Sequence, residues 1–153
     1  MSEHDYVHDE EIEEIQGLAR AIHGHPMISE FSSDNGLTFA NLGPWCSALV
    51  TLPSLERVKF GIQEPETEDR HALLNLEPFK ELLRTPALRV VQFDDFYFTN
   101  EVCYAIANAL EEGSSITDMI FDDKCVFPDG GRAIIANALK TNASVIKVTG
   151  LDP

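Results

Sequence analysis

The sequence predicts an α/β solenoid, with short parallel strands side by side on a concave face and helices along the convex face. Two observations predict this fold class. The pentapeptide at residues 106–110 recurs unchanged at residues 135–139, 29 residues later. Apolar residues also recur at relative positions 1, 4 and 6 of successive segments. Since one unit of this size cannot bury its own apolar face, neighbouring units stack and share a core.

Five strands are expected, one in each unit. The apolar patterns begin at residues 28, 55, 88, 116 and 145, so successive units are 27, 33, 28 and 29 residues apart. Alternating apolar and polar residues at positions 4 to 6 are typical of a strand with one face toward a core. The inward residues are Phe31, Val58, Phe60, Val91, Phe93, Met119, Phe121 and Val148.

Helices are expected between these strands, because apolar residues there recur at steps of three and four. A strand, a helix and a second strand in short succession favour parallel pairing with a right-handed crossover. The expected ranges are residues 10–23, about 44–51, about 69–84, and two helices around the repeated pentapeptide. Thr99 or Asn100 is predicted to begin the fourth helix and Gly113 to end it, with Asp129 and Asn142 in these places for the fifth.

Composition indicates one folded domain, residues 10–153, behind an acidic and disordered leader of residues 1–9. Of 153 residues, 44% are apolar and 24% charged, which is ordinary for a single domain. The net charge of −15 disfavours nucleic acid and anionic membranes as partners. The N-terminus lacks the pattern of a secretory signal, and the three widely spaced cysteines indicate reduced thiols. We therefore expect an intracellular protein, in the cytoplasm or the nucleus.

The strand pattern L-x-x-L-x-L, followed by helices with a period of 28 or 29 residues, resembles the ribonuclease-inhibitor type of leucine-rich repeat. The residues that carry the resemblance are Leu88, Val91, Phe93, Ile116, Met119 and Phe121. It implies a horseshoe segment of about five units. The sequence departs from the family after the strand, where Phe96 and Lys124 replace the usual Asn and Cys125 follows one place later. The loops are therefore expected to turn differently.

The resemblance implies a non-enzymatic module that binds a protein partner on its concave strand face. The sequence contains no nucleophile elbow, phosphate-binding glycine loop or H-E-x-x-H motif, so no enzyme activity and no cofactor are expected. His4 and His8 have the spacing of metal ligands, but a solvated acidic leader is the favoured interpretation. Two alternatives stay open: an activator of a small GTPase resembling the Ran GTPase-activating proteins, whose catalytic motif has no match here, and an actin-binding module of tropomodulin-like architecture.

Outward strand positions supply the candidate contact residues. Carboxylates that follow adjacent strands, about 4.8 Å apart, are expected to form a cluster that either attracts a basic partner or is an ordinary solvated rim. Basic residues are expected to give the N-terminal half of the face the opposite charge, with Val90 and Ile120 as a small apolar patch. Of the three adjacent aromatic residues at 96–98, Tyr97 is expected to be exposed, whereas Phe98 aligns with Phe127 and is expected in the core. The candidate partner-binding residues are Asp94, Asp95, Tyr97, Asp118, Ile120, Asp122, Asp123, Arg57, Lys59, Arg89 and Gln92.

The last strand is expected to leave an open edge, because no further helical pattern follows it in the sequence. An open parallel strand favours pairing with another chain. Either the array continues in a longer protein or this edge docks on another chain, and we predict that the isolated protein is marginally stable or self-associates through residues 145–148.

Overall fold

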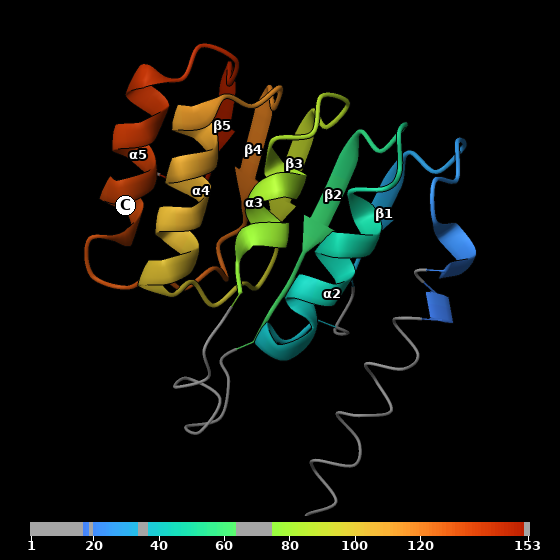
Figure 1. Ribbon diagram of the computed structural model, residues 1–153. Helices are drawn as coiled ribbons and strands as arrows, with labels where there is room; N and C mark the ends of the chain where they lie inside the picture. The colour runs from blue at the N-terminus through green and yellow to red at the C-terminus, as the bar shows by residue number, and fades with distance from the viewer. Residues whose placement is uncertain (1–16, 19, 34–36, 64–74, 152–153) are drawn as a thin grey trace, which may run out of the picture.

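The computed structural model describes residues 17–18, 20–33, 37–63 and 75–151. Five parallel strands lie in the order β1-β2-β3-β4-β5, and the helices cover one face of this sheet (Figure 1). The predicted α/β solenoid, with strands on the concave side and helices on the convex side, is confirmed. The strands are β1 Glu30–Ser32, β2 Arg57–Phe60, β3 Val90–Phe93, β4 Asp118–Phe121 and β5 Lys147–Thr149. The helices are α2 Phe39–Leu49, α3 Glu77–Leu83, α4 Asn100–Glu112 and α5 Gly131–Thr141.

The register of the sheet follows the spacing of the repeats. One row of laterally paired residues runs through Glu30, Arg57, Val90, Asp118 and Lys147. These residues are 27, 33, 28 and 29 positions apart, which are the steps predicted from the apolar patterns. A one-residue slip would turn every apolar side chain away from the core, so the core itself sets this register.

The core is a continuous layer between the sheet and the helices. Val58, Val91 and Met119 are fully buried, as predicted. Phe93 lies at the centre of an aromatic cluster, with its ring 5.3 Å from that of Phe121 and in contact with the rings of Phe60, Phe96 and Phe98. Val148 differs from its counterparts, being 39% exposed, because β5 has only one neighbouring strand among the described residues.

Helices α2, α3 and α5 begin where the sequence predictions did not place them. Helix α2 begins at Phe39 rather than near Pro44, because Thr38 and Asn41 form a capping box at its start. The helix then continues through Pro44. Helix α5 is capped by Gly130 and not by Asp129: Gly130 adopts φ 79°, a left-handed conformation that glycine tolerates without strain.

The fourth helix agrees with its prediction. The hydroxyl of Thr99 accepts a hydrogen bond from the amide of Val102, 3.2 Å away, at the start of α4. Gly113 ends the helix with φ 118°. Helix α3 begins at Glu77, so the helix predicted over residues 69–84 is wrong at residues 75–76, where Leu76 is the N-cap and Pro78 follows at the first turn. Residues 69–74, and most of the helix predicted over residues 10–23, lie outside the described residues. The domain boundary at residue 10 lies outside them as well and stays a prediction.

Among the described residues, no helix combines the length and the apolar character needed to cross a bilayer.

Candidate functional site

The sheet face opposite the helices carries the outward side chains of all five strands, and we call it the open face. Because alternate residues of a strand point to opposite sides of a sheet, two rows of side chains project here. The rows are Glu30, Arg57, Val90, Asp118 and Lys147, and then Ser32, Lys59, Gln92, Ile120 and Thr149.

Apolar side chains lie near the middle of the open face. Val90 is half-buried between Arg57 and Asp118 in its row, and Ile120 is half-buried beside Gln92 in the other row. They stand on the adjacent strands β3 and β4, as the sequence predicted. Water therefore reaches two aliphatic groups that are surrounded by polar and charged groups.

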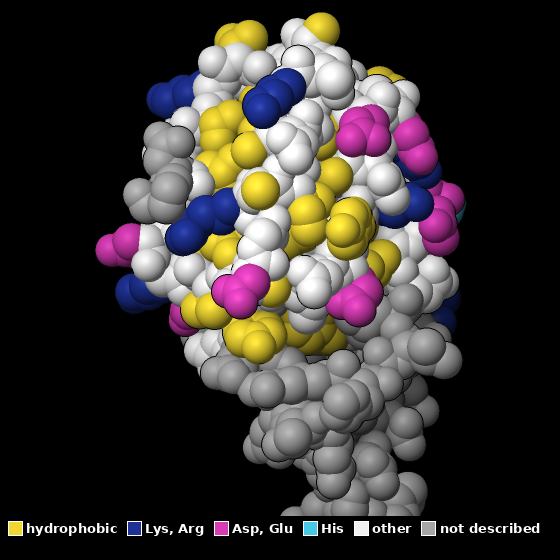
Figure 2. Space-filling model, turned by 90° about the vertical axis from the view of Figure 1, so that its left-hand side faces the viewer, with side chains coloured by type: hydrophobic (Ala, Val, Ile, Leu, Met, Phe, Trp, Pro, Cys, Tyr) yellow, Lys and Arg dark blue, Asp and Glu magenta, His cyan; other side chains and the backbone are white. Residues whose placement is uncertain are grey.

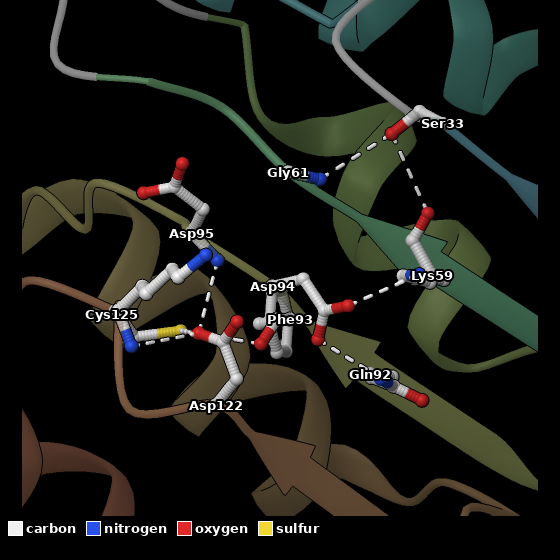
Figure 3. Close-up of polar contacts among 10 residues, drawn as sticks. Ser33, Lys59, Gly61, Gln92, Phe93, Asp94, Asp95, Asp122 and Cys125 are labelled. Carbon is white, nitrogen blue, oxygen red and sulfur yellow. Dashed lines mark hydrogen bonds and ion pairs between the residues drawn. The ribbon is translucent and has the colours of Figure 1, made fainter.

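The charges on the open face are interleaved rather than divided between its two halves. Lys59 Nζ lies 3.1 Å from Asp94 Oδ2, and Gln92 Nε2 donates to Asp94 Oδ1 at 2.9 Å (Figure 3). Arg57 Nε lies 3.7 Å from Glu30 Oε1. The prediction of a basic N-terminal half and an acidic C-terminal half is therefore wrong, because side chains of opposite sign pair between neighbouring strands.

Arg89 precedes β3, at the end of the strand opposite to Asp94. One guanidinium nitrogen of Arg89 donates to the carbonyl oxygens of Pro86 at 2.6 Å and Ser115 at 3.3 Å. The side chain is exposed but helps to fix the turns that precede two strands.

Asp122 connects the ends of β3 and β4. Its Oδ1 accepts hydrogen bonds from the amides of Asp95 and Lys124, at 3.0 and 3.1 Å, and from the thiol of Cys125 at 3.4 Å (Figure 3). Burial alone would raise the pKa of Asp122, but these hydrogen bonds and the nearby Lys124 outweigh it and lower that pKa. The carboxylate therefore has a structural use in addition to any contact with a partner.

The four carboxylates of the predicted cluster have different surroundings. Asp94 is paired with Lys59, and Asp122 binds backbone amides, while Asp95 and Asp123 are exposed. Asp95 has φ 50°, which Asp tolerates better than most residues. The role of these four carboxylates in binding a partner stays a prediction.

Cys125 performs a connecting role that sequence reasoning missed. Its thiol also donates to the carbonyl of Phe93 in the preceding unit, at 3.2 Å. Burial, and to a smaller extent the Asp122 carboxylate, raise the pKa of Cys125 to about 12. Burial raises the pKa of Cys103 to about 11 and that of Cys46 still further. None of the three cysteines is a thiolate nucleophile at neutral pH. The sequence offered one indication of this contact: Cys125 stands one place after the position where the repeats that this chain resembles have an Asn.

Tyr97 is less accessible than the sequence predicted. It is half-buried, packs against the core and forms a parallel bridge with Val126. Its neighbours Phe96 and Phe98 are buried. Tyr97 therefore belongs in part to the turn that joins two units.

No group of three metal-binding side chains occurs within the described part of the chain. His4 and His8 lie outside it.

Comparison with known proteins relates the fold to two solved domains. No protein-family model and no curated protein sequence matches the chain. The tropomodulin C-terminal domain of Caenorhabditis elegans superposes with a TM-score of 0.64 and 15% identity, over 88% of this chain and 81% of that one. The leiomodin-1 actin-binding site 2 superposes with a TM-score of 0.62 and 17% identity, over 92% of this chain and 77% of that one. At these identities the likeness establishes the fold alone: an α/β solenoid of the leucine-rich-repeat kind.

Proposed function

We propose that this chain is a non-enzymatic protein-binding module that receives its partner on the open face of the sheet. The observation that carries the proposal is the pair Val90 and Ile120, half-buried on adjacent strands of a face that no described helix covers. Burying these side chains under a partner would release water from apolar surface at the centre of the contact.

The surroundings of this pair have the composition of a contact rim. Protein interfaces commonly have an apolar centre and a polar, hydrated edge. Arg57 and Lys59 lie on one side of the apolar pair, on β2, and Lys147 and Thr149 lie on the other side, on β5. Asp118 lies beside Val90, on the same strand as Ile120. The ion pairs of Arg57 and Lys59 are partly exposed, so each is worth at most about 1 kcal/mol. A partner can therefore replace them with its own charged groups at small cost.

Actin is the partner that the comparisons favour. The leiomodin-1 domain is named for an actin-binding site, and its fold covers 92% of this chain. Activation of a small GTPase stays a prediction that no observation here favours, and measuring GTP turnover with a panel of GTPases would test it.

We also assign the repeats to the ribonuclease-inhibitor type. Helices on the convex side, and units 27 to 33 residues apart, support this assignment. The Cys125 thiol that bonds the Phe93 carbonyl is the feature by which these units depart from the usual Asn.

Binding to actin can be tested with substitutions on the two faces of the molecule. In the double variant Val90→Arg/Ile120→Arg, two charged side chains occupy the centre of the open face. We expect the wild-type chain to sediment with actin filaments or to bind actin monomers, and the double variant to bind at least tenfold more weakly. Tyr104→Arg is the control, because Tyr104 is 56% exposed on α4, on the helical side.

The possible outcomes separate the partner from the surface. If the wild-type chain binds neither form of actin, actin is excluded as the partner. If the folded double variant binds as well as the wild type, the open face is not the binding site. Circular dichroism of each variant checks that it is folded.

A further inference from the structure

The two helix-to-strand segments at the C-terminal end of the solenoid, α4 to β4 and α5 to β5, carry opposite charges. Between the start of α4 and the end of β4 there are four acidic residues and no basic ones: Glu101, Glu111, Glu112 and Asp118. Between the start of α5 and the end of β5 there are three basic residues and no acidic ones: Arg132, Lys140 and Lys147. In a chain with a net charge of −15, the segment from α5 to β5 is therefore a local region of positive charge, with Asp129 before it and Asp118 beside Lys147 in the sheet.

Exposed apolar side chains lie in the same part of the molecule. Val126, Ile146 and Val148 are 53%, 82% and 39% exposed. Figure 2 looks at the end of the solenoid where α5 lies, and shows apolar side chains in its middle, with basic ones above and beside them and acidic ones below them and toward the right. We call the surface formed by α5, β5 and Val126 the terminal face.

The outer edge of β5 is also available for contact. Among the described strands, β5 pairs only with β4. The backbone groups on its other edge face away from the sheet, and such edges readily accept another segment of chain. The terminal face thus offers positive charge, apolar groups and backbone hydrogen-bonding groups together.

A segment with the complementary character is present in the same sequence. Residues 1–16 contain seven acidic residues, no Lys or Arg, and the apolar residues Tyr6, Val7, Ile12 and Ile15. We propose that residues 3–15 of a second copy of this chain dock on the terminal face. Arg132, Lys140 and Lys147 attract the carboxylates, and Ile146 and Val148 bury the apolar side chains.

The topology favours a second copy over the same molecule. Residues 3–15 join the described part of the chain at Gly17, and Figure 1 shows the residues that follow it beyond β1, at the opposite edge of the sheet from β5. The N-terminal end of one copy, near β1, therefore meets the β5 end of the next copy, which is a head-to-tail association. Two terminal faces would instead bring the basic residues Arg132, Lys140 and Lys147 of both copies together, and the like charges would oppose contact.

Sedimentation velocity of the full chain over a range of concentrations tests this proposal. In 50 mM salt we expect assembly that grows with concentration, and in 500 mM salt an apparent dissociation constant at least tenfold higher, because salt screens the charges. Lys147→Glu should weaken assembly at least fivefold. Tyr104→Glu/Asn108→Glu is the control, because it changes the net charge equally on two exposed residues of α4 and should leave assembly unchanged.

A charge exchange identifies the acidic segment as the occupant. One variant carries Glu10→Lys, Glu11→Lys, Glu13→Lys and Glu14→Lys, and the other carries Lys140→Glu and Lys147→Glu. Each alone should remain monomeric at concentrations where the wild type assembles, and an equimolar mixture should form a complex. A wild-type chain that is monomeric at every concentration would overturn the proposal, and so would assembly that the acidic-segment variant retains. Neither result bears on the open face.

Discussion

Asp122 shows how one side chain at the end of a strand can join two repeats. Its carboxylate binds the amide of Asp95 in the preceding unit and the amide of Lys124 in its own turn. The thiol of Cys125 links the same turn to the carbonyl of Phe93. The turns after β3 and β4 are therefore held together by side-chain contacts.

The lowered pKa of Asp122 predicts a pH dependence of stability. The stabilisation that its ionised form provides is complete above the ordinary Asp pKa of about 4 and is lost as the pH falls through the lower pKa of the folded state. The Asp122→Asn variant has no carboxylate at this position to be protonated. Its free energy of unfolding should therefore fall less than that of the wild type when the pH is lowered from 5 to 3.

Urea denaturation at a series of pH values measures this difference. Asp123→Asn is the control, because Asp123 is exposed and should give the pH dependence of the wild type. Parallel curves for Asp122→Asn and the wild type would show that the hydrogen bonds to Asp122 do not favour its charged form.

At Gly61 the backbone of the neighbouring unit leaves no room for a larger side chain. A Cβ there would lie 2.7 Å from the carbonyl oxygen of Asp94, so Gly61→Ala should destabilise the chain by about 1–3 kcal/mol. Thermal unfolding of this variant measures the shift, and a stabilised Gly61→Ala would contradict the close approach of β2 and the turn after β3.

At the scale of elements, the strands were predictable and the helix starts were less so. The apolar positions of Val58, Val91 and Met119 set the register, because the core requires them to face the same side. The start of α5 depends on the left-handed conformation of Gly130, which periodicity does not encode. The start of α2 depends on a reciprocal pair of hydrogen bonds between Thr38 and Asn41.

The open face could be predicted in part. Strand alternation placed Val90, Gln92 and Ile120 on it, because that alternation is set by backbone geometry. The pairing of Lys59 with Asp94 was not predicted, since it joins the middle of β2 to the residue after β3 and depends on side-chain reach. Tyr97 was expected to be more accessible than it is. Its backbone bridge to Val126 could not be predicted, because it leaves no periodic pattern in the sequence.

Asn142 connects helix α5 to β5 and to the preceding unit. Its amide nitrogen donates to the carbonyl of Leu110 at 2.9 Å, and its Oδ1 accepts from the amides of Ser144 and Val145. Asn142→Ala should cost about 1–3 kcal/mol, because several partly buried backbone groups lose their partner.

The effect of Asn142→Ala should be concentrated in the terminal unit. Hydrogen exchange of residues 145–149 is expected to become faster in this variant, while exchange in β3 changes little. Asn137→Ala, at an exposed position of α5, is the control and should leave exchange unchanged. Unchanged exchange at residues 145–149 in Asn142→Ala would show that this side chain does not hold the unit.

At the scale of the whole molecule, two surfaces have different characters. The open face has interleaved charges around Val90 and Ile120, and the terminal face combines basic side chains with exposed Ile146 and Val148. The two surfaces share β5 but differ in chemistry, so a partner protein on the first and a second copy on the other are separate events with separate tests.

The central claim is that a partner contacts the open face, and site-specific photo-crosslinking tests it most directly. A photoreactive residue replaces either Gln92, in the middle of the open face, or Tyr104, exposed on α4. After irradiation with purified actin, we predict a crosslinked product from position 92 and none from position 104. A product from position 104 alone would place the contact on the helices and contradict the account.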